Sequence, residues 1–121
     1  MSADGVTPAQ REAVIVRAKG YCEYCLSPAR YSFGPFAVDH VTPKARGGKS
    51  RLNNLAFICS GCNGHKHAKV KAIDPLTQKL VRLFNPRRQP WAEHFTWNED
   101  ATHLNGLIAT GRATIKALRM N

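Results

Sequence analysis

The sequence predicts a fold of the α+β class, built around two short strands and a helix. Apolar runs at 36–41 and 55–58 have the length and residue types of β-strands, and a helix is expected from Ser60 through Lys69 or Val70. One CxxC pair precedes this unit and a second lies where its second strand meets the helix, and four thiolates in two such pairs are the usual ligands of a structural Zn²⁺. We therefore expect one zinc ion, bound by Cys22, Cys25, Cys59 and Cys62.

A further helix is predicted before the first cysteine pair, over residues 7–19. Thr7 can cap this helix, and Pro8 suits its first position. Gln10 completes a capping box with Thr7. Gly20 is the expected C-terminal stop.

The signals weaken beyond residue 74. Apolar residues in 76–84 are consistent with one face of a helix, although their spacing is irregular. A hairpin is predicted from 91–97 and 104–109, around a polar turn. Thr110 is the expected cap of a last helix that runs through Leu118.

Length and charge limit the possible organisation and partners. At 121 residues we expect a single domain over 1–121, with a core motif at about 20–70 and a C-terminal extension at about 74–121. The net charge is +10, from 18 Lys and Arg against 8 Asp and Glu. Such an excess favours nucleic acid over membrane as the partner, although charge alone leaves a basic protein with no specific partner open.

The chain shows no apolar run long enough for a transmembrane helix, and residues 1–5 do not begin a signal peptide. We therefore expect a cytoplasmic protein without membrane association. Thiols kept inside the cell favour metal binding over disulfides. Two disulfides remain the alternative use of the four cysteines.

A turn-rich basic loop is predicted between the two strands, over residues 42–54. Gly47-Gly48 lies at its centre. A solvated surface loop is one interpretation. Because the loop directly follows the strand that carries the candidate chemistry, contact with phosphate is the interpretation that we favour. The candidate phosphate contacts are Lys44, Arg46, Lys49 and Arg51.

The Asp39-His40 dipeptide between the cysteine pairs is the main candidate for chemistry. It offers a hard oxygen ligand and a proton acceptor at one point of the chain, which metal-assisted phosphodiester cleavage requires. An ideal strand would turn the two side chains to opposite faces. A bend or bulge is therefore expected to bring the Asp39 carboxylate to the metal.

These residues together resemble the HNH endonuclease family in its zinc-containing ββα-metal (His-Me finger) form. The motifs occur in order between about residues 20 and 70, and the later tail is similar to an extension of bacterial and phage members. The resemblance implies a metal-dependent DNA endonuclease acting on double-stranded DNA. The matching text is Cys22-x-x-Cys25, Val38-Asp39-His40-Val41-x-Pro43, Gly47-Gly48, Asn53-Asn54-Leu55 and Cys59-x-x-Cys62-Asn63-x-x-Lys66.

The resemblance also implies roles for individual residues. His40 is the expected general base, and Asn54 is expected to hydrogen-bond backbone across the loop and so fix His40. Asp39 and Asn63 are the expected ligands of the catalytic ion. Asn63 stands where the family often has histidine, and an Asp and Asn set favours Mg²⁺ or Mn²⁺ over a second Zn²⁺.

Two further residues of the second helix are candidates. Lys66 matches the family lysine and is expected to approach either a phosphate or the backbone of the motif itself. His67 lies four residues after Asn63, on the same face of an ideal helix. It is a candidate further metal ligand or phosphate contact, with an exposed polar residue as the alternative.

Two other interpretations stay open at this stage. The first is a four-cysteine zinc finger that binds nucleic acid without cleaving it. Its pairs are ordinarily separated by about 15–20 residues, whereas residues 26–58 separate them here. The second is a nuclease that works with a partner protein in a phage or restriction system.

Overall fold

The computed structural model describes residues 5–121, which form three helices and three antiparallel sheets of two strands each. Residues 1–4, which belong to the segment expected to lack a signal peptide, lie outside the described residues. None of the helices within 5–121 is long and apolar enough to span a membrane. The elements are α1 (Pro8–Ala18), β1 (Ala37–His40), β2 (Leu55–Ile58), α2 (Ser60–Lys66), β3 (Lys71–Ile73), β4 (Leu80–Arg82), β5 (Phe95–Trp97), β6 (Leu104–Gly106) and α3 (Ala109–Leu118).

The first helix begins with the predicted capping box. Thr7 Oγ1 accepts a hydrogen bond from Gln10 N at 3.1 Å, and Gln10 Oε1 accepts one from Thr7 N at 2.9 Å. The helix ends at Ala18, where Lys19 and Gly20 take left-handed φ values of 56° and 77°. Both predicted ends of α1 are therefore confirmed.

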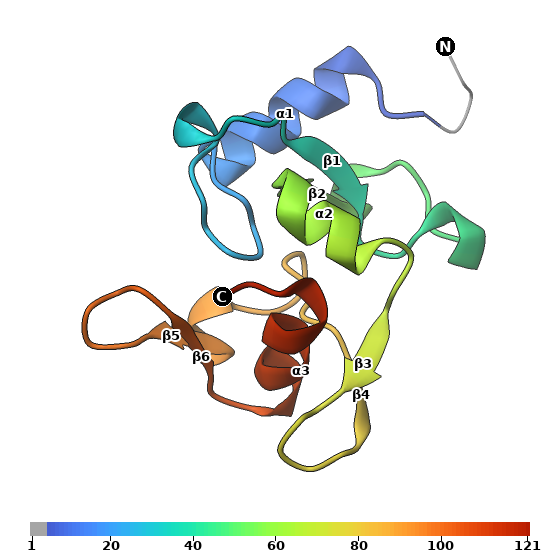
Figure 1. Cartoon of the computed structure of the whole chain (residues 1–121). Helices are drawn as coiled ribbons and strands as arrows, with labels where there is room; N and C mark the ends of the chain where they lie inside the picture. Colours follow the sequence, from blue (N-terminus) through green and yellow to red (C-terminus); the bar gives the residue numbers. More distant parts are fainter. Residues whose placement is uncertain (1–4) are drawn as a thin grey trace.

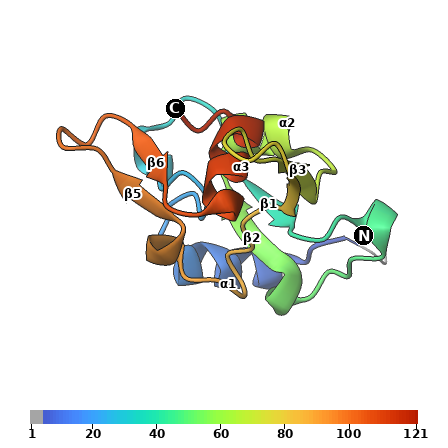
Figure 2. The same cartoon turned by 90° about the horizontal axis from the view of Figure 1, so that it is seen from below.

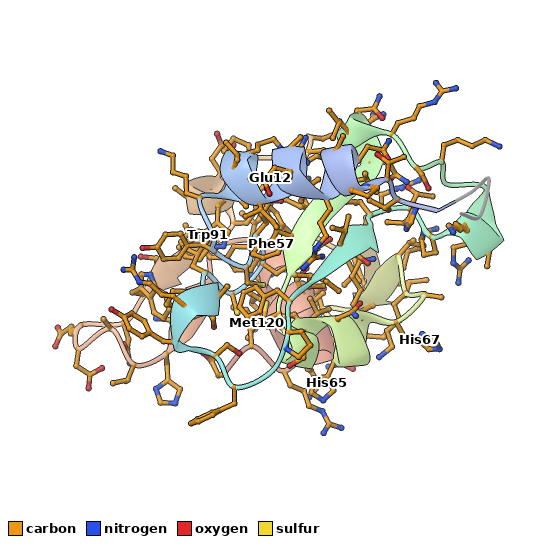
Figure 3. The ribbon with its side chains drawn as sticks, turned by 90° about the horizontal axis from the view of Figure 1, so that it is seen from above. Glu12, Phe57, His65, His67, Trp91 and Met120 are labelled. Carbon is orange, nitrogen blue, oxygen red and sulfur yellow. The ribbon has the colours of Figure 1, made fainter. Side chains whose placement is uncertain are left out.

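The β1–β2 hairpin lies between two helical layers. β1 and β2 pair antiparallel, with Ala37 opposite Ile58 and His40 opposite Leu55. α1 packs on β2, whereas α2 packs on β1 and on α3, as Figures 1 and 2 show. All of β2 is buried, and Phe57 lies near the middle of the molecule in Figure 3. The hairpin is thus the centre of the N-terminal half.

The prediction of a helix over 76–84 was wrong, because β3 and β4 form a hairpin there. The Asp74 carboxylate accepts hydrogen bonds from Leu76 N at 3.1 Å and from Thr77 Oγ1 at 2.8 Å. Gln78, with a φ of 61°, completes the reversal of the chain. An aspartate that bonds the backbone ahead of it favours a turn over a helix, which explains the difference.

The second helix is shorter than the sequence predicts, since α2 ends at Lys66 instead of Lys69 or Val70. His67 leaves the helical conformation with a φ of 48° and a ψ of −120°. The chain then enters β3, which pairs with β4. Pairing within the β3–β4 hairpin, which continues to Val70 through the hydrogen bond from Leu83 N to Val70 O, has overridden the local helix preference of 67–70.

The C-terminal half is arranged around α3, with the β3–β4 hairpin on one side and the β5–β6 hairpin on the other (Figure 1). The predicted hairpin at 91–97 and 104–109 is confirmed, with shorter strands. The last helix is also confirmed, but Ile108 occupies its N-cap position and Thr110 lies inside it. The reason is that Ile108 is the last extended residue before the helix.

A buried ion pair joins the β3–β4 turn to α3. Arg112 Nε and Nη2 each donate to one carboxylate oxygen of Asp74, at 2.9 Å. Asp74 is fully buried, and the bidentate guanidinium holds the pKa of its carboxyl well below the ordinary range. This pair fixes the hairpin on the helix.

Replacing Arg112 with methionine should lower the melting temperature at pH 7 by several degrees, because Asp74 would be left buried without its counter-charge. Lys116→Met removes a cation from an exposed position of the same helix and should have little effect. The charge of Asp74 stabilises the fold fully above the ordinary carboxyl pKa of about 4, and this stabilisation is lost as pH falls from there toward the lowered pKa of the folded protein. The difference in melting temperature between the Arg112 variant and the original protein should therefore shrink as pH falls below about 4. Thermal unfolding at a series of pH values checks this. A difference in melting temperature that stays unchanged down to about pH 2 would contradict the assignment.

Candidate active site and metal-binding cluster

The four cysteines of the two CxxC pairs come together beside the β1–β2 hairpin. Their Sγ atoms all lie within 4.8 Å of one another, and no disulfide joins them. The Sγ atoms of Cys25 and Cys59 are 3.7 Å apart. Tetrahedral coordination at Zn–S distances of about 2.3 Å requires sulfur atoms about 3.8 Å apart. The cluster is therefore positioned to bind a metal ion, and its donors are consistent with zinc.

Local backbone geometry brings each pair into place. In the first pair, Cys22 N donates to Ser27 O and Leu26 N donates to Cys22 O, both at 2.9 Å, and Leu26 has a φ of 66°. In the second pair, Cys59 is the N-cap of α2, and its Sγ accepts a hydrogen bond from Cys62 N at 3.4 Å. Each CxxC pair is thus a tight turn that directs two sulfur atoms to the same point.

The thiols cannot all carry charge at this spacing without a cation. Hydrogen bonds with the other cysteines, together with burial, raise the pKa of Cys22 and Cys62. Hydrogen bonds from the other three cysteines lower the pKa of Cys25. Like charges a few ångströms apart oppose one another's ionisation. A bound divalent cation would remove that repulsion, which agrees with the donor chemistry.

The residues between Cys22 and Cys25 connect the cluster to the rest of the molecule. Glu23 N donates to Phe57 O, and Phe57 N donates to Glu23 Oε2, both at 2.8 Å. Glu23 also forms an ion pair with Arg87 of the C-terminal extension. Tyr24 is fully buried, and its hydroxyl donates to Asp39 Oδ2 at 3.1 Å. One turn therefore contacts β2, β1 and the extension.

Asp39 lies on the buried face of β1. Its carboxylate contacts Lys66 Nζ at 3.1 Å and accepts the Tyr24 hydrogen bond. Burial raises the pKa of Asp39, and the Lys66 ammonium opposes that shift. The strand register is regular through residues 37–40, so the expected bulge is not found there. A hard oxygen donor nevertheless lies at this position, already balanced by one positive charge.

Lys66 is almost fully buried, at 2% exposure, and its amine faces the motif itself. Nζ donates to the carbonyls of His40 and Val41 at 3.4 and 3.2 Å, besides contacting Asp39. Lys66 was expected to approach either a phosphate or the backbone of the motif, and the structure has the second of these contacts. A buried, fully engaged amine is a poor phosphate contact, so the residue is better described as an internal support of β1.

His40 ends β1 on the opposite face from Asp39 and is half-buried. Its Nε2 lies 2.8 Å from Ser50 Oγ in the basic loop. The Ser50 carbonyl in turn accepts a hydrogen bond from Gln10 Nε2 at 2.7 Å, which anchors the loop to α1. Ser50 is not among the residues predicted from the sequence, because a loop serine carries no motif signal. Its only sequence clue is its position ten residues after His40.

Asn54 joins the two ends of the basic loop. Its Oδ1 accepts a hydrogen bond from Thr42 N at 2.9 Å, and its Nδ2 donates to the carbonyls of Thr42 and Lys49, both at 3.0 Å. Val41 N also donates to Asn54 O at 2.9 Å. The loop is therefore closed directly behind His40.

Asn63 and His67 do not share a regular helix face. Asn63 is half-buried within α2, whereas His67 is the C-cap residue, whose backbone N–H bonds Asn63 O at 2.9 Å. Because the helix ends at Lys66, the predicted common face of these two residues does not form. Figure 3 shows His65 and His67 near the end of α2, at the edge of the molecule in that view.

The basic loop exposes its charged side chains. Lys44, Arg46, Lys49 and Arg51 lie at or near the surface. The short 3-10 turn Lys44–Arg46 starts the loop, and Arg46 Nε donates to Ala68 O at 3.0 Å. Gly48 permits the closure, since a Cβ there would meet Thr42 O at 1.7 Å. The loop is thus a closed, positively charged surface next to His40.

The comparisons with known proteins agree with this geometry. A search of the curated proteins gives no match. A family model, HNH endonuclease, matches residues 22–69. The matched segment begins at the first cysteine of the cluster and ends just beyond α2, so it contains the four cysteines, β1, the basic loop, β2 and α2. The predicted resemblance to the HNH endonuclease family is therefore confirmed for residues 22–69.

Proposed function

We propose that the protein is a metal-dependent DNA endonuclease that hydrolyses phosphodiester bonds. The observation that supports this most directly is the site at the end of β1. There, within the family-matched segment, His40 is held by Ser50 in a closed basic loop while Asp39 lies beneath the same strand. These are a proton acceptor, a hard oxygen donor and a cationic surface, which metal-assisted hydrolysis of a phosphodiester needs together.

In this proposal β1, β2 and α2 form a ββα-metal core within one domain, 1–121. The cysteine cluster holds a structural Zn²⁺, because four thiolates fill a tetrahedral site and leave no position for substrate. Asp39 and Asn63 would hold Mg²⁺ or Mn²⁺ at a separate site, where the ion would supply Lewis-acid stabilisation of the leaving oxygen.

The protein's own residues carry out the proton transfer and the positioning. His40 accepts a proton from the attacking water on a ring nitrogen. Ser50 and Asn54 are positioning residues, because one contacts the imidazole and the other closes the loop that carries Ser50. Lys66 partly neutralises the negative charge of Asp39. The proposal needs no covalent enzyme intermediate.

Double-stranded DNA is the proposed substrate, bound through its phosphates by Lys44, Arg46, Lys49 and Arg51. Exposed cations on a loop contact the backbone and carry no sequence information by themselves. We therefore propose weak sequence preference. A zinc module that only binds DNA is the competing function, and absence of cleavage activity in the original protein would favour it.

Freshly purified protein should contain one zinc per chain, measured by elemental analysis. Cys59→Ser removes one ligand, so it should lower the melting temperature and the zinc content together. Ser27→Ala, which removes a hydroxyl 3.0 Å from Cys25 Sγ and no ligand, is the matched control. Zinc-free protein with two disulfides would contradict the structural zinc site.

His40→Ala should retain the fold, the zinc and DNA affinity, but reduce cleavage by about 10²–10⁴-fold, the usual effect of removing a general base. Asp39→Asn keeps the size of the buried side chain but removes the counter-charge of Lys66, so it should weaken binding of the catalytic ion and also lower the melting temperature. Raised Mn²⁺ should therefore partly restore Asp39→Asn, but not His40→Ala. Plasmid cleavage by His40→Ala at the original rate would show that the base lies elsewhere.

Charge reversal in the basic loop should weaken binding to all DNA sequences alike. Lys49→Glu should also reduce the slope of log K against log salt, by about 1 for each phosphate that the protein no longer binds. Lys79→Glu changes the charge equally on the exposed β3–β4 turn and serves as the control. A Lys49 variant with full affinity and an altered cleavage sequence would contradict backbone contact.

A further inference from the structure

A second cationic surface lies beside the basic loop, in a cleft of about 820 Å³. Its walls come from α1, from the two ends of the basic loop, from the end of α2 and the chain that follows it, and from the segment 82–89. Within the described part of the chain the lining includes no aspartate or glutamate. We call it the arginine cleft, and its cationic lining residues are Arg17, Lys66, Lys69, Arg82, Arg87 and Arg88.

The floor of the arginine cleft is apolar and buried, whereas its rim is charged and exposed. Leu83 and Phe84 at the floor are buried, at 6% and 2% exposure. Lys69, Arg82 and Arg88 at the rim reach solvent, and no ion pair joins them to other described residues. No exposed aromatic ring lines the cleft within residues 5–121, so a base would find nothing to stack on. The lining therefore suits phosphate groups and not bases.

Two other arginines of the wall are held in place by protein groups. Arg17 Nη1 donates to Leu52 O at 2.9 Å, and Arg87 forms the ion pair with Glu23. The Nε of Arg87 is buried without a hydrogen-bond partner in the described structure. Burial, with a smaller contribution from the charge of Arg17, lowers the pKa of Arg87 to about 10. The cleft thus carries more positive charge than its own groups neutralise.

The arginine cleft adjoins the basic loop that follows His40. Thr42 and Asn54, which hydrogen-bond each other behind His40, also line the cleft. Three of its cations, Arg82, Arg87 and Arg88, lie beyond the family-matched segment 22–69. The C-terminal extension therefore adds positive charge beside the loop that the family motif provides.

We propose that the arginine cleft binds the phosphodiester backbone of the DNA substrate, next to the segment that contacts the basic loop. The inference rests on the proposed endonuclease function for the identity of the polyanion. A cleft rimmed by cations from both halves of the chain extends the contact along the backbone without reading bases. The C-terminal extension is then part of the DNA-binding surface.

The test measures binding of a fluorescent DNA duplex in EDTA, so that cleavage plays no part. Arg82→Gln/Arg88→Gln should weaken binding about tenfold near 0.1 M salt and reduce the salt slope by about 2. Lys79→Gln/Arg119→Gln removes the same charge from positions outside the cleft and should change affinity less than about twofold. Melting temperatures check that both double variants fold.

Three results would separate the possibilities. Equal affinity and equal salt slope in the two double variants would overturn the proposal. So would displacement of the duplex by inorganic phosphate at the same concentration of phosphate groups, which would assign the cleft to a free anion. If the original protein binds DNA through the cleft but never cleaves it, the cleft proposal stands and only the endonuclease proposal fails.

Discussion

The rest of the structure depends on the convergence of two CxxC pairs from opposite ends of the family-matched segment. A hairpin of two four-residue strands is marginal by itself, so something must hold β1 and β2 in place. The cysteine cluster does so at one end, where Glu23 exchanges hydrogen bonds with Phe57 of β2. Tyr24 extends the same constraint to Asp39. The metal-binding cluster and the candidate active site are therefore parts of one hydrogen-bonded unit.

Some charged side chains of this protein form buried ion pairs, and others lie at the surface. Asp39 and Lys66 neutralise each other in the interior, and Asp74 and Arg112 do so in the C-terminal half. Many of the remaining lysines and arginines reach solvent; one group lies on the loop that follows His40, and another lines the arginine cleft beside it. Much of the net charge of +10 is therefore concentrated where a polyanion would meet the candidate site. This distribution supports the proposal that the C-terminal extension contributes to DNA binding.

The sequence predicted the elements whose signals are local. Thr7 and Gln10 define the start of α1, and the cysteine spacing predicted a cluster that the structure brings together. The hairpin at β3 and β4 was missed because apolar spacing does not record the turn that the Asp74 carboxylate forms with Leu76 and Thr77. Ser50 was missed for a similar reason, since only the folded loop brings its hydroxyl to His40. Local periodicity and motif spacing carry no information on such contacts.

Cleavage of DNA at the site around His40, with a divalent ion, is the central proposal. Incubation of supercoiled plasmid with the purified protein, in Mg²⁺, Mn²⁺ or EDTA, tests this most directly. We predict nicked or linear plasmid with either ion and intact plasmid in EDTA, while the zinc stays bound. Intact plasmid under every condition, from protein that holds its zinc and binds DNA, would contradict the proposal and leave a zinc-stabilised DNA-binding module.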